Sequence, residues 1–252
     1  AVGWYRFATD RPEDHPRVSD AELAHIRGDG ARVEKTPTPW RAILTHPNVW
    51  LLMLANFGFG CGIYIFQSWF YLYLVNVRGF SVMQGGLLTT SPFIAVSLLG
   101  PLGGVCSDAL VKCYGLTMGR RAIAISGFLL AAFCMYTGAQ AENSYTAVAL
   151  LSLGDGFLYF GAAAIVGTNI DIAGAHSGTV YGLTATLLQI GGAIAPTLTP
   201  LIAERFGWEA ALQFAALLAL FSAFLWLFID AANKIAPTEE QRLRGASLAA
   251  VR

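Results

Sequence analysis

Residues 49–75 read VWLLMLANFGFGCGIYIFQSWFYLYLV, an apolar run of 27 residues that contains no Asp, Glu, Lys or Arg. As an α-helix, this run is long enough to cross the roughly 30 Å hydrocarbon core of a bilayer. Five further apolar runs follow, at 84–107, 122–140, 145–170, 178–203 and 210–229. Helices in the cores of soluble proteins are shorter. The sequence therefore predicts an all-α integral membrane protein with six transmembrane helices.

The composition also indicates a membrane protein. Hydrophobic residues make up 55% of the chain and charged residues 13%, against about 25% charged residues in an ordinary soluble domain. The mean hydropathy is +0.54. The formal net charge of +0 gives no basis for a nucleic-acid partner. The four cysteines lie in or beside apolar runs without a C-x-x-C pair, so we expect no disulfide, no metal site and no cofactor.

The positive charges lie on one side of the predicted membrane. Fourteen of the 16 Lys and Arg residues precede the first run, follow the second or follow the sixth. Only Arg78 and Arg205 lie in the loops of the other side. By the positive-inside rule, we expect a multi-pass protein of the cell (plasma or inner) membrane with both termini in the cytoplasm.

Three regions follow from this arrangement. Residues 1–48 are predicted to be a cytoplasmic loop with a short amphipathic helix, because Ser19-Asp20-Ala21-Glu22 has the pattern of a capping box. Residues 49–230 are predicted to form the six-helix bundle, and residues 231–252 a cytoplasmic tail. The chain begins without a methionine, so we expect it to be part of a longer protein.

The second and fifth runs are rich in glycine and proline. Gly100 and Gly104 have the small-xxx-small spacing that lets membrane helices approach closely. Four prolines remove internal hydrogen bonds and predict bends: Pro92, Pro101, Pro196 and Pro200. Bent, mobile helices suit a transporter better than a static anchor. The alternative is that glycine and proline are simply commoner in membrane helices.

The most informative motif lies in the predicted cytoplasmic loop 104–121. Gly104 and Asp108 form G-x-x-x-D at the end of the second run, and Gly119-Arg120-Arg121 precedes the third. We expect the Asp108 carboxylate to lie within reach of these guanidiniums or of a helix N-terminus. Such a contact would be a conformational gate that holds two helices together in one state and releases them in another. An ordinary positive loop with one acid is the alternative.

These residues resemble the loop motif of the major facilitator superfamily, and the spacing between Asp108 and Gly119 resembles its anion:cation symporter family. Members of that family include hexuronate, aldarate and phthalate permeases. Further segments resemble the same family: Trp69-Phe70, Asp171-Ile172-Ala173-Gly174, and Gln189 through Pro196. The resemblance implies that the six predicted spans are helices seven to twelve, the C-terminal half of the fold. It also implies that the N-terminal six-helix half is a missing partner.

Polar side chains at membrane depth are candidates for lining a solute path. The candidates are six residues: Asn56, Tyr64, Gln67, Thr168, Asn169 and Gln189. For each of them, a hydrogen bond between helices is the alternative role.

Asp155 is the one acid near the middle of a predicted span. An acid at that depth costs roughly 2.5–3.5 kcal/mol on insertion scales, so it must be protonated, paired or facing water. We expect Asp155 to face the cavity and to take part in proton or cation coupling. A protonated acid bonded to a neighbouring helix is the alternative.

The function predicted from these features and the resemblance is secondary transport, by alternating access, of a small organic anion such as a sugar acid, in symport with H⁺ or Na⁺. An oligomeric six-helix channel is a second hypothesis, although no ring of charge or polar filter is visible. An intramembrane aspartyl protease is a third. Ser152-Leu153-Gly154-Asp155 lacks the first glycine of its motif, and no second mid-membrane Asp is present. We therefore expect no enzyme activity.

Overall fold

The computed structural model describes residues 9, 12–27 and 38–235, and the chain divides into two units, Ala1–Thr38 and Pro39–Arg252. In the first unit, the short helix η1 (Pro12–Asp14) precedes α2 (Asp20–Arg27). The Ser19 hydroxyl accepts a hydrogen bond from the backbone N–H of Glu22 at 3.2 Å, which caps the start of α2.

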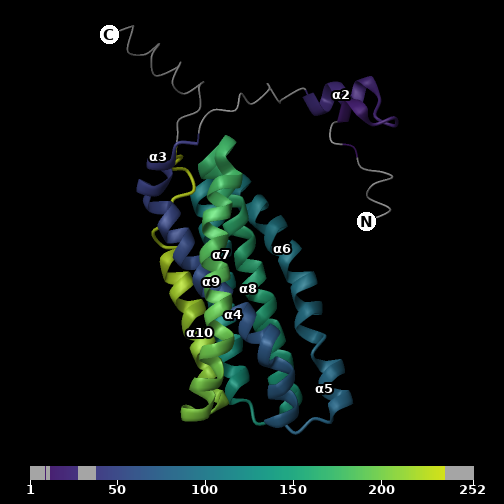
Figure 1. Cartoon of the computed structure of the whole chain (residues 1–252), viewed down its shortest axis with the longest axis vertical. Coiled ribbons are helices and arrows are strands. Elements are labelled where there is room, and N and C mark those ends of the chain that lie inside the picture. Colours follow the sequence, from purple (N-terminus) through teal and green to yellow (C-terminus); the bar gives the residue numbers. More distant parts are fainter. Residues whose placement is uncertain (1–8, 10–11, 28–37, 236–252) are drawn as a thin grey trace. The chain divides into compact units, whose positions relative to one another are not determined.

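The second unit is a bundle of long helices (Figure 1). Within residues 38–235 these are α4 (Pro47–Asn76), α6 (Ser91–Tyr114), α7 (Leu116–Gln140), α8 (Ser144–Ala173), α9 (Ser177–Phe206) and α10 (Trp208–Leu225). The shorter helices are α3 (Trp40–Thr45), α5 (Val82–Leu88) and η2 (Gly174–His176). The all-helical architecture expected from the sequence is confirmed.

Five continuous helical stretches within the described residues are long and apolar enough to span a membrane. One of them, Ser144–Phe206, is 63 residues long and includes both α8 and α9. A single straight helix of that length would measure about 95 Å, three times the thickness of the hydrocarbon core. This stretch therefore makes two crossings, and the bundle has the six that the apolar runs predict.

The contacts between helices require this alternation of direction. Along α4 and α9 the contacts advance together, from Gly60 beside Leu188 to Trp69 bonded to Pro196, so these two helices run parallel. The helices α7 and α8 pack antiparallel through Gly127 and Gly161, where an added Cβ on Gly127 would lie 2.5 Å from the Gly161 nitrogen. Parallel and antiparallel neighbours in one bundle are the arrangement of a chain that crosses repeatedly.

The predicted loop 104–121 is wrong as a loop. The helix α6 continues through Asp108 to Tyr114, and α7 begins at Leu116. One residue, Gly115, joins them with φ of 84°, a left-handed conformation that glycine adopts without steric cost. Apolar runs do not predict this extra helical length, because charged residues follow position 107.

The second predicted span is interrupted just before Pro92, because α5 ends at Leu88 and α6 begins at Ser91, which puts Pro92 in the first turn of α6. There its missing N–H costs no helical hydrogen bond. Pro200 lies inside α9 and leaves the Pro196 carbonyl without its usual donor. The indole Nε1 of Trp69 on α4 donates to that carbonyl at 3.0 Å, so a contact between helices replaces the lost bond.

The close contact of α6 with α8 uses a different glycine from the one predicted. A Cβ on Gly103 would lie 2.4 Å from the Phe160 carbonyl oxygen, whereas no described atom lies within 4 Å of one on Gly104. A Cβ on Gly100 would meet only Tyr159, at 3.8 Å. The face of α6 that packs against α8 therefore lies about one residue away from the predicted Gly100/Gly104 face.

Arg78 caps one end of α7. Its guanidinium donates to the carbonyl oxygens of Ala141 at 2.5 Å, Ala139 at 3.1 Å and Gly138 at 3.3 Å, and to the Tyr73 hydroxyl at 2.6 Å. The last carbonyls of a helix have no partner within the helix and carry partial negative charge. Arg78 therefore satisfies the C-terminal end of α7.

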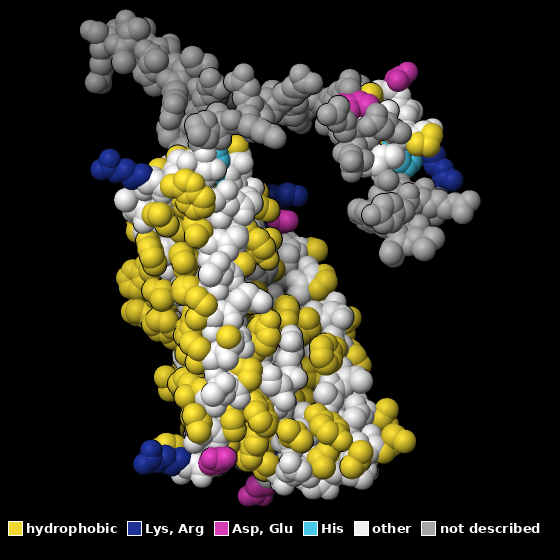
Figure 2. Space-filling view, in the orientation of Figure 1, with side chains coloured by type: hydrophobic (Ala, Val, Ile, Leu, Met, Phe, Trp, Pro, Cys, Tyr) yellow, Lys and Arg dark blue, Asp and Glu magenta, His cyan; other side chains and the backbone are white. Residues whose placement is uncertain are grey.

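The sides of the bundle are apolar and its ends carry the charges (Figure 2). In the most apolar 18-residue part of α4, 72% is buried inside the bundle. In the corresponding part of the stretch Val82–Tyr114, which contains α6, only 11% is buried. This stretch is the least covered by other helices, and Figure 1 shows α5 and α6 at the edge of the bundle.

Candidate functional site

Arg120 lies in the first turns of α7 and joins three helices. Its Nη1 donates to the Ser107 hydroxyl at 2.8 Å and to Asp108 Oδ1 at 2.9 Å, both on α6. Its Nε donates to Asp171 Oδ2 at 2.9 Å, near the end of α8. We call Ser107, Asp108, Arg120 and Asp171 the Arg120 cluster. It connects α6, α7 and α8 through side chains alone.

Two glycines make room for this cluster. A Cβ on Gly167 of α8 would lie 2.5 Å from Arg120 Cζ, so the guanidinium lies directly against the α8 backbone. A Cβ on Gly119 would lie 2.5 Å from the Val111 nitrogen, so Gly119 permits the close approach of α6 and α7. Larger residues at either position would push the helices apart.

The two acids of the cluster differ in exposure. The Asp171 side chain is 20% exposed and that of Arg120 is 12% exposed, whereas the Asp108 side chain is 67% exposed. Exposed ion pairs contribute about 0–1 kcal/mol, while removing one partner of a shielded pair is more costly. Asp171 is therefore the stronger partner, although the sequence motif points to Asp108.

Two residues of the predicted gate lie outside the cluster. The Nε of Arg121 donates to the Ile229 carbonyl at 2.6 Å, after α10, so Arg121 faces away from Asp108. Gly104 has open space beside it and makes no close contact between helices in the described part of the chain. Of the predicted gate residues, the structure brings together Asp108, Gly119 and Arg120, and it adds Ser107, Gly167 and Asp171.

A second group of polar residues lies deeper in the bundle. Asp155 on α8 is 7% exposed, and its Oδ1 has no hydrogen-bond partner among the described residues. Tyr159 follows one turn later on the same face of α8, and Gln67 on α4 is exposed. Phe59 of α4 contacts the Tyr159 ring edge-on, with the ring centroids 5.3 Å apart.

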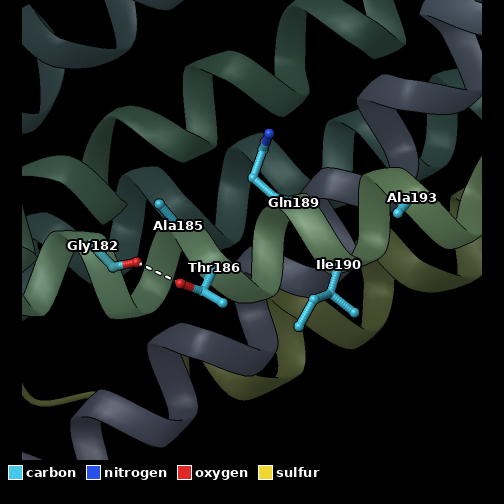
Figure 3. A pocket seen from close by; sticks show the side chains of 6 residues that line it. All are labelled: Gly182, Ala185, Thr186, Gln189, Ile190 and Ala193. Carbon is cyan, nitrogen blue, oxygen red and sulfur yellow. Dashed lines mark hydrogen bonds between the residues drawn. The ribbon is translucent and has the colours of Figure 1, made fainter.

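This group extends to the surface of α9. The Tyr64 hydroxyl donates to Gln189 Oε1 at 3.3 Å. Gln189 and five neighbours line an open hollow of about 490 Å³ on α9: Gly182, Ala185, Thr186, Ile190 and Ala193. Figure 3 shows the Thr186 hydroxyl bonded back to the Gly182 carbonyl, at 2.9 Å. Thr186 and Gln189 are the two polar side chains that line the hollow.

Three of the predicted path residues are buried elsewhere. Asn169 Nδ2 donates to the Ile165 carbonyl at 2.9 Å, and its Oδ1 accepts from Thr184 Oγ1 of α9 at 3.4 Å. The bond between Asn169 and Thr184 joins α8 to α9, which corresponds to the alternative role of a hydrogen bond between helices. Thr168 is fully buried, and its hydroxyl has no partner within the described residues. Asn56 is buried on α4 and does not line the hollow.

Tyr159 was missed by sequence reasoning. It lies in the run Phe157-Leu158-Tyr159-Phe160, where an aromatic ring indicates packing. Its spacing of four residues from Asp155 was the available signal, because residues four apart share one face of a helix. Within residues 12–27 and 38–235, no three His, Cys, Asp or Glu side chains come together to hold a metal ion.

A bundle of six crossings with a charged side-chain cluster at one end and polar groups at mid-depth is the architecture of a polytopic membrane transporter domain. The model of the Major Facilitator Superfamily matches residues 1–112 and 79–251 of this chain. The chain belongs to the Major Facilitator Superfamily, as the sequence motifs indicated.

Several proteins that are similar to this chain are named as transporters. The chain is 33% identical over 218 residues to a probable sulfoacetate transporter of Cupriavidus necator, covering 82% of this chain and 50% of that protein. It is 27% identical over 234 residues to a chloroplastic ascorbate transporter of Arabidopsis thaliana, covering 92% and 43%. It is 30% identical over 220 residues to a probable galactarate/D-glucarate transporter of Bacillus subtilis, covering 80% and 46%. The chain spans about half the length of these relatives.

Proposed function

We propose that this chain is the C-terminal half of a secondary active transporter that carries a small organic anion together with H⁺ or Na⁺. The observation that carries the proposal is the Arg120 cluster, which links three membrane helices at one end only through side-chain contacts. Such contacts form and break without disturbing any helical backbone bond. This is the property that alternating access requires of a gate.

The Arg120 cluster then stabilises one conformation of the transporter. With Arg120 bonded to Ser107 and Asp171, the ends of α6, α7 and α8 stay together and that end of the bundle is closed. In the opposite conformation these bonds separate, and water takes their place. On the positive-inside argument, we assign the Arg120 end to the cytoplasm, with residues 1–48 and 231–252 on the same side.

The deeper polar group serves the solute and the coupling ion in this proposal. Tyr64, Gln67 and Gln189 offer neutral hydrogen-bonding groups to a carboxylic acid, and Asp155 takes up the coupling proton or cation. The second wall of the cavity comes from the N-terminal six-helix half. Because these relatives are named as an ascorbate transporter, a probable sulfoacetate transporter and a probable galactarate/D-glucarate transporter, carboxylates and sulfonates are the first solutes to examine.

Uptake by the full-length protein in proteoliposomes tests this function. Labelled sulfoacetate, galactarate and ascorbate are supplied with an inward H⁺ or Na⁺ gradient, and counterflow is measured with the same acids. We expect saturable uptake of at least one acid, with counterflow and dependence on one gradient. Unsaturable, voltage-driven current without counterflow would instead support the channel hypothesis.

A further inference from the structure

The seven residues 229–235, which follow α10 and which we call the strap, run across the ends of three other helices. At α4, the Asn48 side chain makes two bonds to the Asp230 backbone. Its Nδ2 donates to the Asp230 carbonyl at 2.5 Å, and its Oδ1 accepts from the Asp230 N–H at 3.1 Å. One side chain thus satisfies both backbone groups of a residue outside any helix.

At α7, the strap is bound by two side chains. The Thr117 hydroxyl donates to Asp230 Oδ1, which also accepts from the Ala232 N–H at 3.0 Å. The Ala232 N–H is shared with Thr117 Oγ1 at 3.2 Å. One turn further along α7, the Arg121 guanidinium donates to the Ile229 carbonyl at 2.6 Å.

At α8, the strap ends on a backbone bond, from the Ile235 N–H to the Ile172 carbonyl at 2.9 Å. The strap is also packed into the bundle, because Ile229 and Ala231 are buried, as is Trp226 just before them. These hydrogen bonds and this packing make the strap a fixed part of the bundle end.

The strap bonds to the immediate neighbours of both partners of the main ion pair. Arg121, which holds the Ile229 carbonyl, follows Arg120 in sequence, and Ile172, which accepts from the Ile235 N–H, follows Asp171. In a helix, fixing one residue fixes the rotation and height of the next. The strap therefore constrains α7 and α8 at the positions where Arg120 must meet Asp171.

We propose that the strap positions Arg120 for its bond to Asp171, and that Asp230 is the residue that secures the strap to α7. The proposal rests on the proposed function only in that it makes the strap part of the gate. Asp230 acts through other residues, so it is a positioning residue. Its carboxylate is held by the Thr117 hydroxyl and the Ala232 N–H, and these donors hold its pKa below the ordinary value.

A double-mutant cycle in two backgrounds tests this inference on the full-length protein in detergent. In the wild-type background, the Tm is measured for Arg120→Gln, for Asp171→Asn and for the double variant. Because the two residues share a bond, we expect the double variant to lose clearly less than the sum of the single losses. In an Asp230→Ala background, we expect the same cycle to show less than half of that non-additivity.

The controls separate positioning from general loss of stability. Arg78→Gln removes contacts at the other end of the bundle, so it is expected to lower the Tm. It is expected to leave the non-additivity of the Arg120–Asp171 cycle unchanged. Asp230→Asn keeps an oxygen at Oδ1 and is expected to restore most of it. If Asp230→Ala does not fold, Thr117→Val carries the same measurement, because it removes the donor to Asp230.

Undiminished non-additivity in the Asp230→Ala or Thr117→Val background overturns the inference and leaves the transport proposal untouched. Diminished non-additivity in a protein that shows no uptake of any acid leaves the strap as a positioning element and removes the transport proposal. The two failures are therefore distinguishable.

Discussion

Arginine side chains organise both ends of this bundle, but they bind different kinds of group. At one end, Arg78 donates to three carbonyls at the end of α7 and to the Tyr73 hydroxyl. At the other end, Arg120 donates to Ser107, Asp108 and Asp171, which are side chains on two other helices. The partners of Arg78 come chiefly with the helix itself, whereas the partners of Arg120 depend on how three helices are placed.

This difference separates a permanent cap, Arg78, from the Arg120 contact, which we propose forms and breaks during transport. The carbonyls at the end of α7 need a donor in every conformation, because burial without one costs about 1–3 kcal/mol per group. Asp171 and Ser107 need Arg120 only while the helices are together.

The largest expected effect is that of Arg120→Gln on transport. Glutamine cannot replace the charge or span both Ser107 and Asp171, so the closed state loses its main contact. We expect initial uptake of the transported acid by the full-length protein to fall at least 10-fold, with less than a twofold change in the amount of folded protein. Uptake within twofold of wild type would show that the Arg120 cluster is not part of the transport cycle.

The next effect separates the two ends. Arg78→Gln removes the cap of α7 and is expected to destabilise the protein by about 1–3 kcal/mol, because several carbonyls lose their donor. The expected result is a lower Tm with uptake per folded molecule within twofold of wild type. A large loss of uptake without a change in Tm would contradict the assignment of Arg78 as a cap.

The pH dependence of Asp230 gives a smaller effect at the Arg120 end. Its pKa in the folded state is lowered from the ordinary 3.8, chiefly by the Thr117 hydroxyl and next by the Ala232 N–H. The unfolded chain therefore binds the proton first, and the stabilisation is present above pH 3.8 and lost as pH falls through the lowered value. We expect the Tm advantage of wild type over Asp230→Asn to disappear in that acidic range and to be constant above pH 5.

The smallest effect is that of Asp108→Asn. Its carboxylate is largely exposed and the amide oxygen still accepts from Arg120, so we expect a Tm change equivalent to less than about 1 kcal/mol. Asp171→Asn, measured beside it, should cost more, because that pair is shielded. Equal losses for the two variants would remove the ranking of the two acids.

The sequence predicted the parts of the fold that depend on hydropathy. Each apolar run, such as 49–75 and 178–203, corresponds to a membrane helix, because length and hydrophobicity suffice to define a span. The helix ends were less predictable. Lys112 and Asp108 mark a loop by charge, but α6 continues beneath them, because a helix can extend beyond the apolar core into polar surroundings.

The candidate site was predictable only in part. The motif placed Asp108 and Arg120 near each other, but the partnership of Arg120 with Asp171 joins two segments 51 residues apart. No local sequence pattern predicts a contact between residues so far apart in the chain. Tyr159 and Gly103 were missed for a similar reason, because their roles depend on which face of a helix meets its neighbour, and a shift of one residue changes that face by about 100°.

The accessibility of two engineered cysteines tests the central claim most directly. In the full-length protein with its native cysteines replaced, Ser107→Cys places a thiol in the Arg120 cluster, and Ser144→Cys places one beside Arg78, whose backbone carbonyl accepts from the Ser144 hydroxyl. The rate of labelling by a charged maleimide is measured with and without the transported acid. We predict a change of at least fivefold at position 107 and less than twofold at position 144. No change at position 107 during active transport, or equal changes at both positions, would contradict the account.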